Sequence, residues 1–244
     1  LKKELPSIYC FAWIHEMPTV INSFYGGDQT VQDAFQNCDK LLFGSEFVRA
    51  KFAKEYGLDL SKLSILPYIR NPLVFLSKSP ETEFQSQVRK LKHIKNENDG
   101  QGKILIIGCG TAEPRKGLDT FVRVANLVIN GTESHFVDRI AFEWYGCPTC
   151  SDNYADFCKL DARQLGLEKY ITFMPVTPNF SKRLAQCTVF ILTSREDPYP
   201  LVVLDSMASK VPFVCFEGAG GAADGAPEGQ GAAKGKRSPP NHPA

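Results

Sequence analysis

Between Lys103 and Phe216 the chain alternates between short apolar runs and longer amphipathic segments. We predict buried strands at 103–108, 139–146, 171–174, 189–193 and 212–216. Apolar residues recur at helical spacing in the segments between them, which predicts helices at 116–129, 153–166, 179–187 and 200–209. Strands that alternate with helices form βαβ units, whose parallel strands are covered on both faces. The pattern therefore predicts an α/β domain with a Rossmann-like parallel sheet.

A smaller unit with the same alternation precedes this domain. Its predicted strands are 7–13, 41–44 and 64–67, and a loop and a helical segment around 31–38 separate the first two. The clearest helix is 45–57, because Ser45 is a good N-cap and Gly57 a good C-terminal stop. We therefore expect two α/β units in one chain.

Two other segments lack the apolar periodicity of buried strands and amphipathic helices. Residues 71–102 become increasingly polar and contain Pro80 and an Asn/Asp/Gly cluster, so we predict a linker between the units. Residues 217–244 contain no Val, Ile, Leu, Met, Cys or aromatic residue. Such a segment cannot bury enough apolar surface to offset its ordering entropy. We predict a disordered tail at 222–244.

The charge balance limits the partners of the chain. Lys and Arg number 28 against 27 Asp and Glu, a net charge of +1, whereas binding to nucleic-acid backbone favours a strong positive excess. No apolar run approaches the roughly 20 residues of a membrane span. The eight cysteines stand in apolar contexts, which favours reduced thiols in the cytoplasm. The start at Leu1, without a leader pattern, indicates a fragment.

The loop at 108–117 carries the first candidate site, because ligands of an open parallel sheet bind beyond the carboxyl ends of its strands. Gly108 and Gly110 permit a close approach of the backbone, and Arg115 and Lys116 supply two cations. The helix that starts near Gly117 adds the positive end of its dipole. This combination suits a diphosphate; a tight turn with solvated charges is the alternative.

The loop at 193–205 carries the second candidate site. Asp197 and Asp205 are separated by seven residues, one in the loop and one in the next helix, so that both can face one cleft. Carboxylates accept hydrogen bonds from sugar hydroxyls. Two prolines in this turn lack an N–H, which leaves as amide donors Tyr199, Leu201 and Val202. Acids that cap the N-terminus of a helix are the alternative.

Two further motifs are less specific. His15 follows the first predicted strand and is a candidate site residue, with a structural histidine as the alternative. Cys147 and Cys150 have C-x-x-C spacing, which fits an ordinary loop, a disulfide or half of a metal site. No Asp-x-Asp occurs in the chain, so the sequence offers no carboxylate pair of the kind that clamps Mg²⁺ or Mn²⁺.

Three stretches together resemble glycosyltransferase family 4, the retaining GT-B enzymes: RKGLD at 115–119, FEWYG at 142–146, and SREDPYPLVVLDSMASKVPFVCFEGAGG at 194–221. WIHE and LLFGSEFVRAKF are similar to the later part of that family's acceptor domain. The resemblance implies two Rossmann-like domains of a GT-B fold, both incomplete. Residues 1–70 would belong to the acceptor domain and 103–221 to the donor domain.

The resemblance also implies roles for the acidic residues and the histidine. Asp197, with Glu196 beside it, would contact hydroxyls of the donor sugar, and Asp205 would contact the ribose of the nucleotide. His15 corresponds to a histidine on the acceptor side of the cleft. The resemblance thus implies His15 and Asp197 as the catalytic residues.

The remaining implied contacts go to the donor's diphosphate. They come from the loop amides at Tyr199, Leu201 and Val202 and from Gly110, Arg115 and Lys116. The family needs no metal and no cofactor besides the nucleotide diphosphate sugar. The implied reaction is a hexosyl transfer with retention to a glycan or lipid-linked acceptor, in polysaccharide biosynthesis. Its expected place is the cytoplasm, with contact to the inner face of a membrane left open.

Two other interpretations remain open at this point. IIGCGTAE at 106–113 resembles the glycine loop of S-adenosylmethionine-dependent methyltransferases, although Ile106 stands where those loops usually carry an acid. The other alternative is a fragment that binds nucleotide without turnover.

Overall fold

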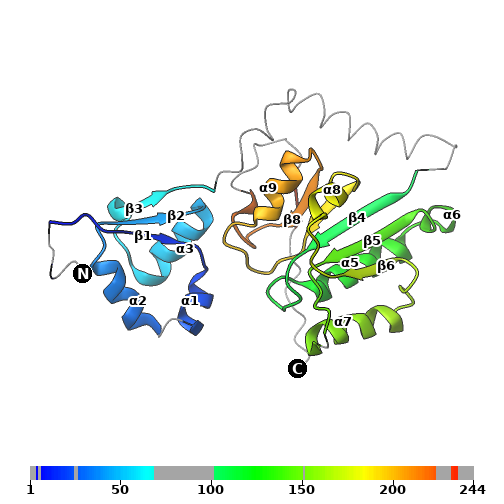
Figure 1. Ribbon diagram of the computed structural model, residues 1–244, viewed down its shortest axis with the longest axis horizontal. Coiled ribbons are helices and arrows are strands. Elements are labelled where there is room, and N and C mark those ends of the chain that lie inside the picture. Colours follow the sequence, from blue (N-terminus) through cyan, green and yellow to red (C-terminus); the bar gives the residue numbers. More distant parts are fainter. Residues whose placement is uncertain are drawn as a thin grey trace. The chain divides into compact units, whose positions relative to one another are not determined.

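The computed structural model describes residues 4, 7–24, 27–68, 102–150, 152–223 and 232–235 (Figure 1). Contacts divide the chain into two units, which we describe separately. The first unit comprises Leu1–Arg70, Glu196–Leu201 and Gly218–Gly225. The second unit comprises Asn71–Arg195, Val202–Glu217 and Ala226–Ala244. The predicted linker lies outside the described residues except for Gly102.

The second unit is built on a parallel six-stranded sheet. Its strands are β4 (Ile104–Cys109), β5 (Ile140–Tyr145), β6 (Ile171–Met174), β7 (Val189–Leu192), β8 (Phe213–Phe216) and β9 (Ala232–Gly235). They lie in the order β6-β5-β4-β7-β8-β9, with every neighbouring pair parallel. Successive strands are added on one side of β4 and then on the other. The predicted Rossmann-like sheet is confirmed.

Helices connect these strands. They are α5 (Leu118–Gly131), α6 (Ser134–Val137), α7 (Asn153–Gln164), α8 (Phe180–Leu184) and α9 (Leu201–Ala208). The apolar sides of α5 and α7 pack in one core cluster with residues of β4, β5 and β6. Phe121 lies at the centre of this core and meets Phe142 and Trp144 edge to face. This packing fixes α5 against the sheet, and the chain reaches α5 from the carboxyl end of β4.

Gly108 belongs to this core rather than to a ligand site. Its place at the start of the 108–117 segment predicts a glycine that lets the backbone approach a ligand. In the structure it lies within β4, and a Cβ there would stand 2.7 Å from both Phe121 and Trp144. The two aromatic rings therefore require glycine at this position.

Strand β9 differs from the expectation of a tail without structure. Its four residues pair in parallel with β8, from Phe213↔Ala232 to Phe216↔Gly235. Backbone pairing of this kind uses N–H and C=O groups that every non-proline residue carries, so a segment of small residues can supply it. The rest of the predicted tail lies outside the described residues, apart from Ala222 and Ala223.

The first unit contains a parallel three-stranded sheet in the order β1-β2-β3. Its elements are β1 (Phe11–Ile14), α1 (Pro18–Phe24), α2 (Gly27–Gln36), β2 (Lys40–Phe43), α3 (Glu46–Tyr56) and β3 (Leu63–Ile65), with a 3-10 turn at Leu60–Lys62. The caps predicted for α3 are confirmed: the Ser45 side chain accepts from the N–H of Val48, and Gly57 is left-handed at φ 60°.

Helix α1 occupies a stretch predicted as loop. Pro18 takes its first position, where a missing N–H is tolerated. The amides of Val20 and Ile21 both donate to the carbonyl oxygen of Met17, at 3.0 Å. Only seven residues long, the helix contains no complete apolar repeat that a sequence pattern could reveal.

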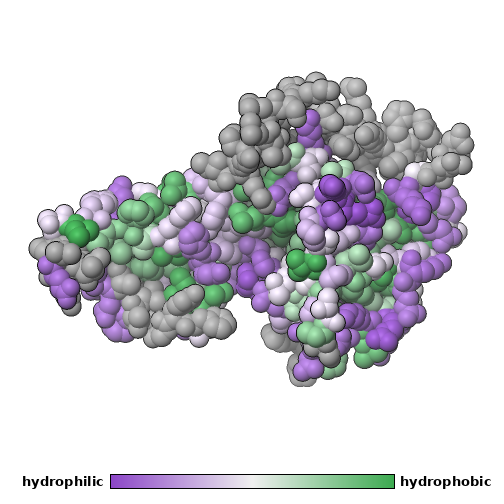
Figure 2. Space-filling model, in the orientation of Figure 1, coloured by the Kyte–Doolittle hydropathy of each residue, from purple (hydrophilic) through white to green (hydrophobic). Residues whose placement is uncertain are grey.

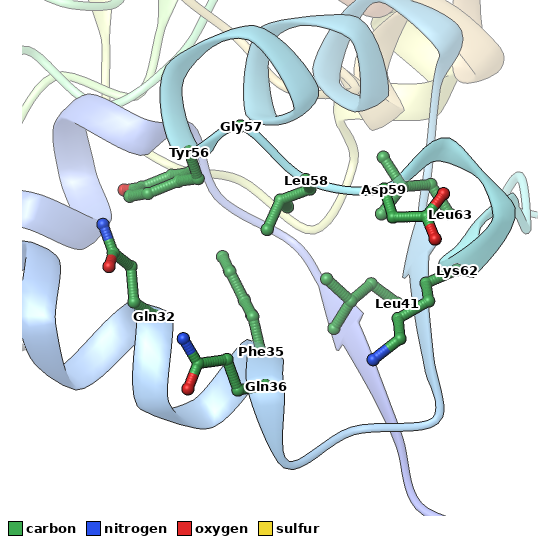
Figure 3. A pocket seen from close by; sticks show the side chains of 10 residues that line it. All are labelled: Gln32, Phe35, Gln36, Leu41, Tyr56, Gly57, Leu58, Asp59, Lys62 and Leu63. Carbon is green, nitrogen blue, oxygen red and sulfur yellow. The ribbon is translucent and has the colours of Figure 1, made fainter.

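The core of the first unit lies between its sheet and its helices, around Phe43 and Phe52. A cavity of about 210 Å³ opens beside it (Figure 3). Phe35 and Leu58 point toward each other across this cavity. Its lining includes Leu63, the first residue of β3, so the cavity lies near the amino end of that strand.

Figure 2 shows apolar patches separated by hydrophilic surface on the side of the molecule that faces the viewer. Exposed large apolar side chains of the second unit include Leu127, Phe157 and Val176. Dispersed exposed apolar residues are normal on a folded protein.

Candidate functional site

The candidate site lies where the strand order of the second unit reverses. Strands β4 and β7 are neighbours and parallel, and their chains leave the sheet toward helices on different sides. Ligands of open α/β sheets bind outside the carboxyl ends of two such strands. The segments that follow these strands are the β4–α5 loop (residues 110–117) and, within the second unit, the β7 exit (residues 193–195).

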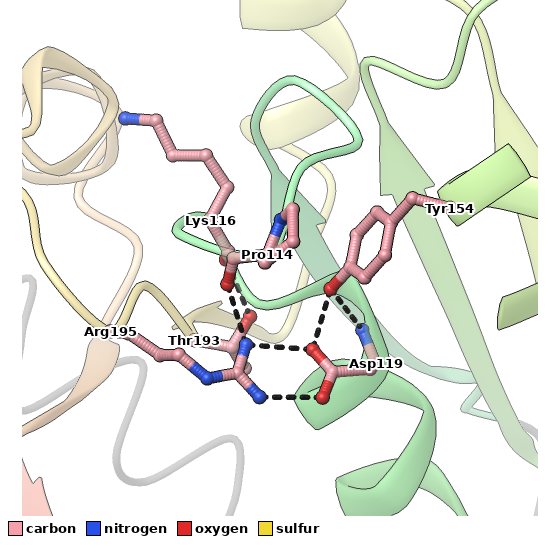
Figure 4. A network of polar contacts seen from close by, with 6 residues as sticks. All are labelled: Pro114, Lys116, Asp119, Tyr154, Thr193 and Arg195. Atoms are coloured by element: carbon pink, nitrogen blue, oxygen red, sulfur yellow. Dashed lines mark hydrogen bonds and ion pairs between the residues drawn. The ribbon is translucent and has the colours of Figure 1, made fainter. Parts of the chain in front are cut away.

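The β7 exit donates hydrogen bonds to three consecutive carbonyl groups of the β4–α5 loop, and Figure 4 shows those to Pro114 and Lys116. The Arg195 guanidinium donates from Nη1 to the carbonyl oxygen of Pro114 at 2.6 Å. The backbone N–H of Arg195 donates to the carbonyl of Arg115 at 2.7 Å. The Thr193 hydroxyl donates to the carbonyl of Lys116 at 3.3 Å. The β4–α5 loop and the β7 exit are therefore in direct contact beyond the carboxyl ends of β4 and β7.

Arg195 also forms a bidentate ion pair with Asp119, the second residue of α5. Nη1 lies 2.8 Å from Oδ1 and Nη2 lies 2.5 Å from Oδ2. The Tyr154 hydroxyl of α7 donates to the same carboxylate at 2.6 Å. Burial raises the pKa of Asp119, but the hydrogen bonds from Arg195 and Tyr154 outweigh it and lower the pKa to about 2. We call Arg195, Asp119 and Tyr154 the triad.

Sequence reasoning assigns no role to Arg195 or Tyr154. Arg195 is 76 positions from Asp119 in sequence, and Tyr154 is 35 positions from it. Patterns of local spacing cannot connect residues so far apart. The sequence carries one weak sign of a role for Arg195: this arginine directly precedes two acidic residues, Glu196 and Asp197, at the end of a buried strand.

Two glycines allow the β4–α5 loop to approach its neighbours. Gly117 has φ 75°, and a Cβ there would stand 2.2 Å from the carbonyl oxygen of Thr193. Gly110 donates its N–H to Tyr145 at 2.9 Å and accepts from the indole N–H of Trp144 at 3.1 Å. The loop is thus supported by both strands that adjoin β4.

Lys116 and Asp205 both act electrostatically on Cys109, the last residue of β4. Burial raises the pKa of this thiol to about 11, while Lys116 lowers it and Asp205 on α9 raises it further. The predicted diphosphate contact Lys116 and the predicted ribose contact Asp205 thus both influence one thiol at the carboxyl end of β4. Arg115 lies one residue before Lys116, with its guanidinium 2.9 Å from Glu113.

The residues from Glu196 to Leu201 belong by their contacts to the first unit. The Glu196 carboxylate lies 2.9 Å from the Lys51 ammonium and accepts a hydrogen bond from the Thr19 hydroxyl. Asp197 is 4% exposed, and its N–H donates to the carbonyl of Ala219 at 3.0 Å. The predicted sugar contact by these two acids stays a prediction.

His15 follows β1 directly in the first unit and lies among aromatic rings. Its Nδ1 is hydrogen-bonded to the Tyr68 hydroxyl, and its ring centroid is 4.6 Å from that of Trp13. Tyr199 packs on the other side of this group, with its ring 5.2 Å from Tyr68. A cavity of about 240 Å³ is lined by Trp13, Ile14, His15, Glu16 and Ile21.

The other predicted contacts and motifs are placed as follows. Leu201 and Val202 open α9, with Leu201 exposed and Val202 half-buried. Cys147 is buried and Cys150 exposed, and both are free thiols. Within the described ranges, no three His, Cys, Asp or Glu side chains gather as a metal site would require. No helix in the described part of the chain is long and apolar enough to cross a bilayer.

Several solved structures share this fold. Anabaena HepE, solved with UDP, matches at a TM-score of 0.66 and 14% identity over 93% of this chain and 58% of its own. WaaG, a glycosyltransferase involved in lipopolysaccharide biosynthesis, matches at 0.65 and 14% identity over 96% and 66%. TarM matches at 0.64 and 15% identity over 93% and 40%. This chain thus spans only part of the length of these three proteins.

The sequence itself matches the model of one protein family. No curated protein sequence matches the chain. The family model described as "Glycosyl transferases group 1" matches residues 89–236, more than half of the chain and nearly all of the second unit's sheet. The comparisons do not favour the methyltransferase interpretation. The α/β architecture with parallel sheets, the GT-B neighbours and this match agree, and the chain belongs to the group 1 glycosyl transferases.

Proposed function

We propose that this chain transfers a sugar from a nucleotide diphosphate donor with retention of configuration, as a hexosyltransferase of glycosyltransferase family 4. The observation that carries the proposal is the contact between the β4–α5 loop and the β7 exit beyond the carboxyl ends of β4 and β7, where Lys116 and Asp205 both act electrostatically on the thiol of Cys109. A cation for phosphate and a carboxylate for ribose hydroxyls are the groups that a nucleotide diphosphate needs. The proposed acceptor is a glycan or a lipid-linked sugar.

In this proposal the β4–α5 loop stabilises the leaving group. The bond between the anomeric carbon and the phosphate oxygen breaks, a bond forms between that carbon and an acceptor hydroxyl oxygen on the same face of the sugar, and the hydroxyl proton leaves with the nucleoside diphosphate, on which negative charge develops. Arg115, Lys116 and the N-terminal end of α5 are positive groups that would meet this charge as it forms. We assign no protein nucleophile.

The proposed roles in the first unit concern the sugar and the acceptor. Asp197 and Glu196 would accept hydrogen bonds from donor hydroxyls, and His15 would act on the acceptor side. The cavity of about 240 Å³ beside His15 has room for part of an acceptor sugar and supports this assignment. We place this reaction in the cytoplasm, because the eight cysteines of the chain stand in apolar contexts, which favours reduced thiols.

Stabilisation by ligands tests the proposal. UDP and UDP-glucose are the first probes because HepE was solved with both; GDP, ADP and S-adenosylmethionine complete the panel. A nucleoside diphosphate at one hundred times its dissociation constant should add about 2.7 kcal/mol to the free energy of unfolding. Protection by S-adenosylmethionine and by no nucleoside diphosphate would overturn the proposal.

We also propose that donor binding needs no divalent metal. The support is the pair of cations at 115 and 116, together with the lack of any Asp-x-Asp in the sequence. Calorimetric titration of the nucleotide with and without excess EDTA tests this. Equal affinities are expected; loss of binding in EDTA would mean that a metal holds the diphosphate. Binding of UDP-glucose without turnover would identify a nucleotide-binding chain instead of an enzyme.

A further inference from the structure

The triad lies beside the β4–α5 loop, yet the loop's predicted ligand contacts point elsewhere. Figure 4 shows the Lys116 side chain extending away from Arg195, while the carbonyl oxygens of the loop are the groups that the β7 exit holds. The polar contacts of Arg195 are made to Asp119 and to the backbone of Pro114 and Arg115. Its contacts are therefore those of a residue that shapes the loop.

The direction of these carbonyl groups matters for an anionic ligand. A carbonyl oxygen that faces a phosphate repels it, whereas an N–H attracts it. Three successive carbonyls, at 114, 115 and 116, are occupied by donors of the β7 exit. Because these carbonyl oxygens are held toward the β7 exit, the opposite side of the loop, where the Lys116 side chain extends, remains for the ligand.

The negative charge of Asp119 gives a second reason for the contact between the β7 exit and the β4–α5 loop. Its carboxylate is in the first turn of α5, close to the proposed diphosphate. Paired with Arg195 in a bidentate contact, this charge is compensated. The 21% exposed Asp119 side chain and the 40% exposed Arg195 side chain place the pair at the edge of the core rather than in bulk solvent.

We propose that Arg195 and Asp119, braced by the Tyr154 hydroxyl, are positioning residues that hold the β4–α5 loop in the shape that binds a diphosphate. The proposal rests on the proposed function and deepens it. It predicts that breaking the pair weakens binding of the diphosphate and leaves binding of the nucleoside unchanged, because the triad shapes only the phosphate end of the site.

The second unit contains a matched control. Arg183 of α8 forms a bidentate pair with Glu143 of β5 at 2.5 and 2.9 Å, and a tyrosine hydroxyl, that of Tyr145, also donates to this carboxylate. Its side chains are 39% and 16% exposed, close to the values of the Arg195–Asp119 pair. In the described part of the chain, the side-chain hydrogen bonds of Arg183 and Glu143 join them to each other, to Gln186 and to the Tyr145 hydroxyl, rather than to the β4–α5 loop or the β7 exit. Variants of the two pairs should therefore lose similar stability and differ only in ligand binding.

The experiment compares Arg195→Lys, Asp119→Asn and Glu143→Gln with the parent chain. UDP, uridine and inorganic pyrophosphate are titrated calorimetrically well below each melting temperature, with GDP and guanosine or ADP and adenosine if the parent prefers them. Lysine keeps the charge but cannot form the two-pronged contact. Arg195→Lys and Asp119→Asn should each weaken UDP and pyrophosphate about tenfold, the equivalent of about 1.4 kcal/mol, and leave uridine within about twofold. Glu143→Gln should leave all three affinities unchanged.

Asp119→Asn separates positioning from simple electrostatics. Removal of a negative charge near a diphosphate would by itself strengthen binding. Positioning predicts weaker binding instead, since the asparagine cannot hold Arg195 in the same way. Equal or tighter UDP binding by this variant would overturn the proposal. So would unfolding of both Arg195→Lys and Asp119→Asn while Glu143→Gln stays folded, since the pair would then serve the fold.

The parent chain separates failure of this proposal from failure of the proposed function. If the parent binds none of the nucleoside diphosphates, both fall. If it binds UDP and the two triad variants bind it equally well, only the positioning role falls.

Discussion

Arg115 and Lys116 are neighbours in sequence, but their surroundings differ. The Arg115 guanidinium is 2.9 Å from Glu113, which already compensates part of its charge. Lys116 lies near Cys109 together with Asp205, at the end of the strand where a ligand is expected. The lysine is therefore the stronger candidate for the diphosphate contact.

Replacing Lys116 should separate a phosphate contact from a surface charge. Lys116→Ala removes a charge-assisted hydrogen bond of about 1.5–3 kcal/mol, so affinity for a nucleoside diphosphate should fall at least about tenfold. Arg115→Ala should have a smaller effect. Affinity for the free nucleoside should be unaffected by either, whereas Asp205→Ala should weaken nucleoside and diphosphate alike. Calorimetric titration of the three variants measures this; unchanged diphosphate affinity in Lys116→Ala would contradict the assignment.

The carboxyl of Asp119 should make the second unit acid-sensitive. Its pKa is about 2 in the folded protein, below the ordinary value of 3.8, so it stabilises the fold above pH 4 and this contribution is lost as the pH falls toward 2. After allowance for partial exposure, we expect about 1–2 kcal/mol. Urea unfolding between pH 2 and 6 should show a shallower acid slope in Asp119→Asn than in the parent. Identical slopes would show that the pair contributes nothing to acid stability.

At the scale of elements, the β4–α5 loop depends on the close approach of its last residue to the β7 exit. Gly117 combines a positive φ with a Cβ position 2.2 Å from a backbone oxygen. Gly166, at the end of α7, has a similar φ of 70° and nothing within 4 Å of its Cβ position. The two glycines thus share the backbone conformation and differ in available space.

Alanine at each of these glycines should separate conformation from crowding. Gly166→Ala should cost about 1–2 kcal/mol, the price of a left-handed conformation for a residue with a Cβ. Gly117→Ala should cost clearly more, because the Thr193 carbonyl must also move, and it should weaken diphosphate binding. Chemical denaturation of both variants measures the difference. Equal losses of stability in the two variants would mean that the β4–α5 loop accommodates the added Cβ at 117 at no further cost in free energy.

Most strands and helices of the second unit could be predicted because each apolar run is long enough and is flanked by turn residues. Strand β6 has the predicted bounds, and α9 differs from its predicted range by one residue at each end. Helices α1 and α6, of seven and four residues, were missed, although α8, of five residues, lies within a range predicted as helix. In a sequence, a glycine that makes room for aromatic rings looks the same as a glycine that makes room for a ligand. The role of Gly108 was misassigned for this reason.

At the scale of the molecule, each unit has an apolar core cluster of its own, and the two clusters share no residue. One includes Phe52 in the first unit and the other Phe121 in the second, and both rings are completely buried. Each core can therefore be weakened without removing side chains from the other.

Calorimetric unfolding should reveal these two cores as separate transitions. Phe52→Ala and Phe121→Ala should each lower one of them, by about 3–5 kcal/mol in free energy. A saturating nucleoside diphosphate should raise the transition that Phe121→Ala lowers, since the β4–α5 loop belongs to that unit. A single transition that both variants lower equally would show that the units unfold together.

The order of the strands also bears on how the nucleotide site is assembled in time. Strand β4 pairs with β5 about 35 residues later, but with β7 only after more than 80 residues. Contacts between distant segments form slowly, because a long loop must close before they gain anything. The contact between Asp119 and Arg195 requires that same closure. We therefore expect nucleotide recognition to appear with the last phase of refolding, so that a bound nucleotide marks a chain that has finished folding.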